Sequence, residues 1–228
     1  MPAPTPVFSR EIFGFFRDLG KHNKKAWMDA NRERYQQAVT RPFRRLLEEL
    51  SPALLALNQN FAVAARGGAN FSRINRDIRF AKDKTPYRAQ MYVKFSVPGP
   101  GGTEGGELYV GISAKTVTAG FRIYAMPKRK ESPIALVAEP KLAANPQLLS
   151  RHKRRLAKKY DSYWYAVDKR EWTKHNGWPA LGDWPRLEGW IVRKKLPRSA
   201  ITRASFPADA ARIFRDLYPL VRFTSLGD

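Results

Sequence analysis

The first sixty residues carry apolar side chains at a helical period, every three or four positions. The pattern predicts a first helix over residues 9–19, with Ser9 as its cap. A second helix follows Asn23, which can cap it, and a third has Pro42 at its first position. The opening region is therefore expected to be helical.

The middle of the chain changes to a period of two. Apolar residues alternate over 91–97, 108–112 and 117–123, and glycine-rich or short turns separate these runs. Strands joined in this way predict an antiparallel meander. Residues 61–65 are a candidate fourth strand.

The second half returns to helical and aromatic segments. Pro146 at a first helical position predicts a helix to about Tyr160, and a last helix is expected over 207–220. Between these two helices, residues 164–190 hold five of the six tryptophans, and we interpret this region as a loop packed down by its own indoles. A strand is expected near 190–196.

Runs of helices on either side of a run of strands predict an α+β fold. We expect N-terminal helices packed on a central antiparallel sheet that C-terminal helices close. A chain of 228 residues fits one domain with a sizeable core. Residues 1–7 are expected to be a loose Pro-rich arm, and residues 8–228 a single α+β domain whose part 131–228 is helical and Trp-rich.

The composition limits the cellular compartments and the kinds of chemical site that this chain is expected to have. The chain has no cysteine, which excludes disulfides, thiolate metal sites and a cysteine nucleophile. It shows no apolar run long enough to span a bilayer, and the N-terminus lacks the pattern of a signal peptide. We therefore expect a cytoplasmic protein with no membrane partner.

The charge balance points to anionic partners. The chain has 42 Lys and Arg residues against 20 Asp and Glu residues, a formal net charge of +22. A field of that sign attracts nucleic acid and phosphorylated small molecules. The alternative is that the cations serve solubility or reflect an arginine-rich genome, because they are spread along most of the chain.

The most informative stretch is residues 71–88, FSRINRDIRFAKDKTPYR, which we call the basic block. Ile74, Ile78 and Phe80 are threaded between its charges, an alternation that a solvated charge run does not need. Arginine forks braced by carboxylates suit phosphate or carboxylate groups. The candidate anion-binding residues are Arg73, Arg76, Arg79, Lys82, Lys84, Tyr87 and Arg88. If residues 72–80 are helical, Arg73 pairs with Asp77 one turn away.

Two other interpretations of the basic block remain open. Asp77 or Asp83 could act as a general base or as a metal ligand, together with Glu107, in an enzyme with a phosphorylated or carboxylate substrate. Each acid, however, has a cation beside it that would compete with a metal. Alternatively, the charges form a structural salt-bridge network that binds nothing.

Elsewhere the chemical signals are weak. The three histidines, His22, His152 and His175, show no ligand spacing, and no metal or cofactor is predicted. The triplet Glu139-Pro140-Lys141 resembles a nuclease motif but lies outside the predicted strands. The aromatic side chains of residues 164–190 would stack on unpaired bases if they were exposed, although a core position is the commoner one for tryptophan.

Three segments carry a family resemblance. They are FFRDLGKHNKKAWMDANRERYQQAVTRPFRRLLEEL near the N-terminus, SRINRDIRFAKDKTPYR in the basic block, and the weaker pair ELYVGIS and TAGFRIYAMP. Together they resemble the DUF2461 family of conserved hypothetical proteins over residues 8–130. The resemblance implies the fold class and brings no established activity. The Trp-rich region and the lone Gly120 depart from the family pattern, so the C-terminal half inherits little.

Overall fold

The computed structural model describes residues 5–65, 69–98, 105–124, 133–166 and 171–225. The helices of this part are α1 (Glu11–Lys21), α2 (Lys25–Ala30), α3 (Arg32–Tyr35), the π-helix η1 (Gln36–Thr40), α4 (Arg41–Leu57), α5 (Pro133–Ala144), α6 (Ser150–Leu156), the 3₁₀ helices η2 (Leu181–Arg186) and η3 (Arg198–Thr202), and α7 (Phe206–Thr224). The strands are β1 (Gln90–Phe95), β2 (Glu107–Ser113), β3 (Val117–Tyr124), β4 (Asp161–Ala166), β5 (Trp172–His175) and β6 (Leu187–Leu196).

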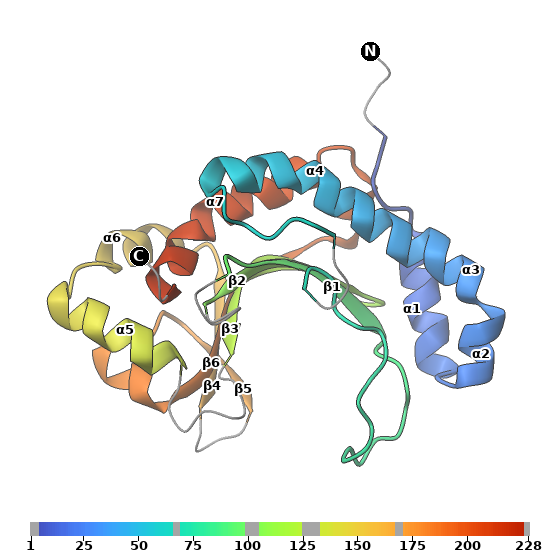
Figure 1. The fold of residues 1–228 in the computed structure, drawn as a ribbon, viewed down its shortest axis with the longest axis horizontal. Coiled ribbons are helices and arrows are strands. Elements are labelled where there is room, and N and C mark those ends of the chain that lie inside the picture. The colour runs from blue at the N-terminus through green and yellow to red at the C-terminus, as the bar shows by residue number, and fades with distance from the viewer. Residues whose placement is uncertain (1–4, 66–68, 99–104, 125–132, 167–170, 226–228) are drawn as a thin grey trace.

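The six strands form one antiparallel sheet in the order β1-β2-β3-β6-β4-β5. The predicted meander is confirmed, with Val110 of β2 opposite Val93 of β1 and Ala119 of β3. Figure 1 shows α4 and α7 lying side by side over one face of the curved sheet. The α+β fold, with helices at both ends of the chain, is therefore confirmed.

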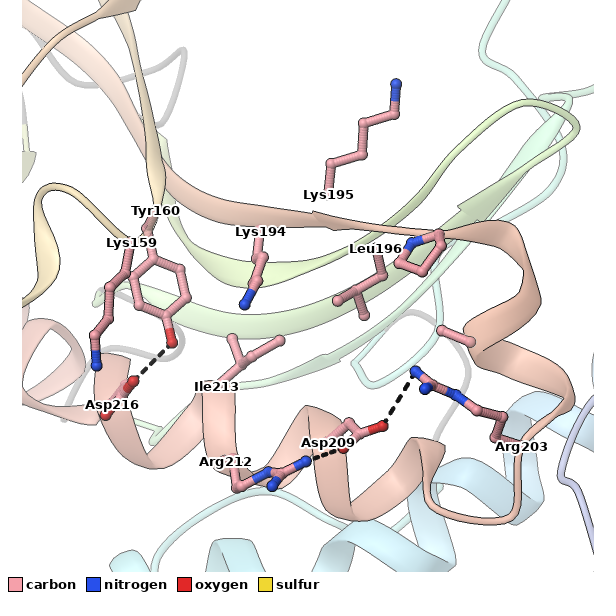
Figure 2. Close-up of a pocket in the computed structure, with 12 residues that line it drawn as sticks. Lys159, Tyr160, Lys194, Lys195, Leu196, Arg203, Asp209, Arg212, Ile213 and Asp216 are labelled. Carbon is pink, nitrogen blue, oxygen red and sulfur yellow. Dashed lines mark hydrogen bonds and ion pairs between the residues drawn. The ribbon is translucent and has the colours of Figure 1, made fainter.

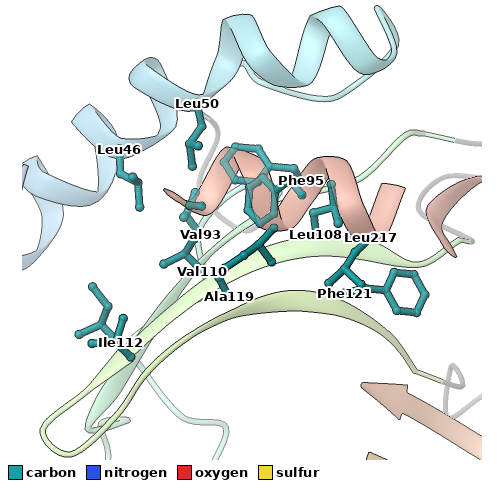
Figure 3. Close-up of a cluster of buried hydrophobic side chains, with 14 of the residues drawn as sticks. Leu46, Leu50, Val93, Phe95, Leu108, Val110, Ile112, Ala119, Phe121 and Leu217 are labelled. Atoms are coloured by element: carbon teal, nitrogen blue, oxygen red, sulfur yellow. The ribbon is translucent and has the colours of Figure 1, made fainter. Parts of the chain in front are cut away.

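The core lies between this sheet face and the helices. Leucines on the inner faces of α4 and α7 point toward alternate strand residues, as Figure 3 shows. The strand contribution has the period of two that the sequence predicts, because successive side chains point to opposite faces of a sheet. The buried side chains drawn there include Leu46, Leu50, Val93, Phe95, Leu108, Val110, Ile112, Ala119, Phe121 and Leu217.

Several predicted elements differ in extent or kind. Residues 61–65 form no strand, although the backbone N–H of Ala62 donates to the Ser96 carbonyl at 3.0 Å. The helix predicted from Pro146 to about Tyr160 is only α6, over Ser150–Leu156. At the N-terminus, residues 5 and 6 lie against α4, where Arg45 donates to the backbone carbonyls of Thr5 and Pro6.

The Trp-rich region is not a loop packed by its own indoles. Part of it forms the strands β4 and β5, which pair with each other and, through β4, with β6. Trp178, Trp184 and Trp190 are buried in the core. Tyrosines and tryptophans have high strand propensity, so this composition suits the added strands.

No helix in the described ranges combines the length and the apolar character needed to cross a bilayer.

Candidate functional site

The basic block is an extended ribbon and contains no helix. Asn75 and Tyr87 form an isolated antiparallel bridge, and the backbone N–H of Arg76 donates to the Pro86 carbonyl at 2.8 Å. A further bond joins Arg88 N to the Ile74 carbonyl at 2.8 Å. Figure 1 shows the two chains of the block running out from β1, away from the helices. The conditional helical model of residues 72–80 is therefore wrong.

The base of the ribbon is anchored in the protein. Phe71 and Tyr87 are buried in the core, so the Tyr87 phenol is not part of the exposed surface. The Asn23 amide donates to the Tyr87 carbonyl at 2.8 Å and accepts from the Tyr87 backbone N–H at 2.9 Å. The Ser72 hydroxyl accepts from the Tyr92 N–H at 3.0 Å, so Ser72 is used by the backbone.

Each acid of the block pairs with an arginine, and the partner of Asp77 is not the predicted one. Arg76 contacts both the Asp83 carboxylate and the Thr85 hydroxyl. Arg79 binds Asp77 through two contacts, at 3.0 and 2.7 Å. The predicted pair of Arg73 with Asp77 does not form, because an extended chain does not bring positions i and i+4 together.

These partners keep both carboxyl groups ionised. The Arg79 guanidinium and the Arg79 backbone N–H lower the pKa of Asp77 to about 2. The Thr85 backbone N–H and the Arg76 guanidinium lower the pKa of Asp83 to about 2. Both acids are exposed, and such ion pairs contribute little to stability. Their main effect is to fix the direction of Arg76 and Arg79.

Three other cations of the block have no such partner. Arg73, Lys82 and Arg88 are exposed and make no ion pair within the described residues. Lys84 also has no carboxylate partner among the described residues, but its ammonium donates to the backbone carbonyls of Ile78 (3.1 Å) and Arg79 (3.4 Å). The ribbon therefore presents cations that remain available to an external anion.

Phe80 lies at the tip of the ribbon with 95% of its surface exposed. The Arg79 guanidinium carbon is 5.9 Å from its ring centroid. A phenylalanine this exposed contributes nothing to the core. The sequence showed the apolar alternation, but only the structure shows that Phe80 faces solvent.

A pocket of about 420 Å³ opens at the base of the ribbon, between it and η1. Its lining residues include Arg44 and Arg73 together with Tyr35, Thr40 and Ser72. The Thr40 hydroxyl is buried and makes no well-formed hydrogen bond in the described part of the chain. Two of the segments that carry the family resemblance thus meet here, a proximity that their spacing in sequence does not reveal.

A second cationic pocket, of about 660 Å³, lies between the end of β6 and α7 (Figure 2). Its arginines, Arg203 and Arg212, both contact Asp209. Its lysines have no ion pair among the described residues and are Lys159, Lys194 and Lys195. No sequence pattern predicts this pocket, because its residues are separated along the chain.

The other chemical candidates stay apart. Glu107 does not join Asp77 and Asp83, since it pairs with Arg122 at 2.7 Å and with Lys94 at 3.7 Å. Among the residues that the structure describes, no three metal-ligating side chains gather in a possible metal site.

The histidines and the nuclease-like triplet also form no common site. His22 stacks on Trp27 and His175 on Trp164, while His152 belongs to α6. The triplet Glu139–Lys141 is part of helix α5, so it lacks the strand that the motif needs.

Comparison with known proteins supports the family resemblance. No curated protein matches the chain. The family model described as conserved hypothetical protein (DUF2461) matches residues 11–223. This match extends the resemblance through the Trp-rich region, beyond the first 130 residues. The chain therefore belongs to the DUF2461 family.

Proposed function

We propose that the protein binds a phosphate-bearing polyanion, nucleic acid, through the basic block. The observation that carries this proposal is the exposed ribbon, with Phe80 at its tip and with Arg73, Lys82 and Arg88 making no ion pair to any residue that the structure describes. Cations without internal partners release counterions from a phosphate backbone when they bind, which is the main source of affinity for nucleic acid. The net charge of +22 steers polyanions toward the protein.

The shape of the block also fits nucleic acid. Two-stranded ribbons bind DNA in its major or its minor groove. An exposed apolar side chain at the tip of such an element can insert between base steps. Phe80 has that position, and Arg79 beside it is held by Asp77. The absence of cysteine fits a function in the reducing cytoplasm.

The alternative interpretations have less support. A carboxylate with a pKa of about 2 is a weak general base at neutral pH, and this applies to both Asp77 and Asp83. A purely structural network does not account for the exposed Phe80 or for the cations that lack partners. A small phosphorylated ligand, held by Arg44 and Arg73 at the base of the ribbon, is the second candidate because both arginines line the pocket there.

The test compares binding of labelled single-stranded and duplex oligonucleotides across a salt series. The variant is Arg73→Ala/Lys82→Ala/Arg88→Ala. The matched control removes three exposed cations that also lack ion pairs in the described structure, Arg10→Ala/Lys153→Ala/Arg215→Ala. Both variants have the same net charge.

We expect the block variant to bind less tightly than the control. Its log–log salt slope should be lower by about 2–3 units, since each phosphate contact contributes roughly 0.9. The control should keep most of the wild-type slope. Equal affinity and equal slope of the two variants would overturn the proposal and leave the +22 charge as general surface chemistry.

A further inference from the structure

The helices that pack on the sheet leave its second face uncovered. In the described part of the chain, α4 and α7 lie on one side, and Figure 1 shows no helix across the other. Side chains alternate along a strand, so the residues between the core positions point to this open face. Strand pairing then determines which of them are neighbours.

Aromatic and cationic residues dominate the open face. Pairing aligns Tyr109 with Lys94 on β1, and Tyr124 and Tyr165 with Gly189 on β6. The aromatic residues of the face are Tyr92, Tyr109, Tyr124, Tyr163, Tyr165 and Trp172. Its cations are Lys94, Arg122, Lys174, Arg193 and Lys195, and its acids are Glu107 and Asp161. The face therefore has both rings and an excess of positive charge.

The centre of the face is rigidly packed. The Arg122 guanidinium lies 4.9 Å from the ring centroid of Tyr92 and 5.0 Å from that of Tyr109. The Glu107 carboxylate accepts from the Nε of the same guanidinium at 2.7 Å. Arg193 lies 4.2 Å from the ring centroid of Tyr163. This packing holds the exposed groups around it in place.

The rings become accessible toward β5. Tyr124 and Trp172 are 45% and 37% exposed, and their ring centroids are 5.5 Å apart in an edge-to-face arrangement. The ring centroid of Tyr165 lies 5.4 Å from that of Trp172. The indole lies over Gly189, where a Cβ atom would be 2.7 Å from the ring, so only glycine permits this position. We call Tyr124, Tyr165 and Trp172 the exposed aromatic cluster, of which Tyr165 is the half-buried member.

Positive charge flanks the exposed aromatic cluster. A pocket of about 420 Å³ begins on the same face, lined by Arg193, Lys195 and Lys174. Lys174 is held by Asp161 at 2.7 Å, whereas Lys195 is exposed and has no ion pair among the described residues. Figure 2 shows Lys194 and Lys195 pointing to opposite sides of β6. Gly189 and Arg193 are four positions apart along β6, which corresponds to about 13 Å.

We propose that the open sheet face binds the unpaired bases of a single-stranded nucleic acid. The bases stack on the exposed aromatic cluster, and the phosphates lie along Arg193 and Lys195. The proposal rests on the proposed function, because it assigns the unpaired bases of the same nucleic acid to a second surface of the protein. Stacking requires base faces, which only an unpaired strand offers, and a sheet with exposed aromatic residues is a known platform for such bases.

The test uses Tyr124→Leu/Trp172→Leu, which keeps an apolar side chain at each position but removes two ring faces. The control is Leu55→Ala/Leu148→Ala, because these leucines are also exposed and lie on other elements. The probes are a labelled single strand, a duplex of the same sequence and an abasic strand. Far-UV circular dichroism establishes that each variant is folded.

We expect the ring variant to bind the single strand roughly 5- to 100-fold less tightly than wild type. Its duplex affinity and its salt slope should stay unchanged, since no phosphate contact is lost. Wild type should also bind the abasic strand less tightly than the intact one. An unchanged affinity for the single strand would overturn the inference.

The two proposals fail in different ways. If the block variant loses affinity and the ring variant does not, the basic block binds nucleic acid and the open face does not. If the ring variant loses affinity for the single strand while the block variant equals its control, the open face binds and the role of the basic block is refuted.

Discussion

Asn23 ties the basic block to the N-terminal helices. Its side-chain amide has one donor and one acceptor group, so it matches both the carbonyl and the N–H of Tyr87. These bonds hold the return strand of the ribbon just before β1. The position of the block therefore depends on a residue 64 positions away in the sequence.

We expect Asn23→Ala to lower the free energy of unfolding by about 1–3 kcal/mol, because two part-buried backbone groups lose their partners. Urea denaturation measures the effect. Asn58→Ala is the control, since the Asn58 side chain accepts from the exposed N–H of Asn60 and the backbone bonds of Asn58 do not depend on its side chain. Equal losses in the two variants would show that the Tyr87 contacts do not stabilise the fold.

The sequence predicts a different role for Asn23, as the cap of the second helix. In the structure α2 begins at Lys25 with no side-chain cap. A capping preference is a local property, whereas the Tyr87 backbone is brought close only by the fold. The same reason explains why the approach of Arg44 to Arg73 could not be read from the chain.

In helix α4, sequence periodicity distinguishes buried positions from exposed ones. Its apolar stripe was predicted from periodicity, and Leu50 is fully buried against the sheet (Figure 3). Leu55, on the same helix, is exposed. A period of 3.6 residues separates these two environments without any tertiary information.

We expect Leu50→Ala to cost about 2–5 kcal/mol of unfolding free energy, since it leaves a cavity between α4 and the sheet. Leu55→Ala should change stability by about 0.5 kcal/mol or less. Chemical denaturation of both variants gives the comparison. Similar losses at the two positions would contradict the packing in Figure 3.

The elements that the sequence did not predict are extended segments that form by pairing with another strand. The basic block extends as a ribbon because its two chains bond to each other, as at Asn75 and Tyr87. Likewise β4 forms alongside β6, where Trp164 lies opposite Trp190. Neither strand pairing has a local sequence pattern. The charge spacing therefore suggested a helix in the basic block, and the tryptophan content suggested a loop.

The whole molecule carries 42 Lys and Arg residues against 20 Asp and Glu residues, a net charge of +22. Net charge far from zero opposes the compact state through self-repulsion. The ion pairs of the basic block are exposed and stabilise little. Repulsion should therefore outweigh ion pairing in the total electrostatic contribution to stability.

We expect the melting temperature to rise when sodium chloride is raised from roughly 20 to 300 mM, because the Debye length falls from over 20 Å to below 10 Å. The rise should be about 2–4 °C for each kcal/mol of repulsion that is screened. A single-stranded oligonucleotide at low salt should raise it further, since a ligand that binds only the folded state stabilises it. Differential scanning calorimetry measures both, with a neutral polymer as control. A melting temperature that falls with salt would mean that the surface ion pairs dominate and that the excess charge imposes no cost on the fold.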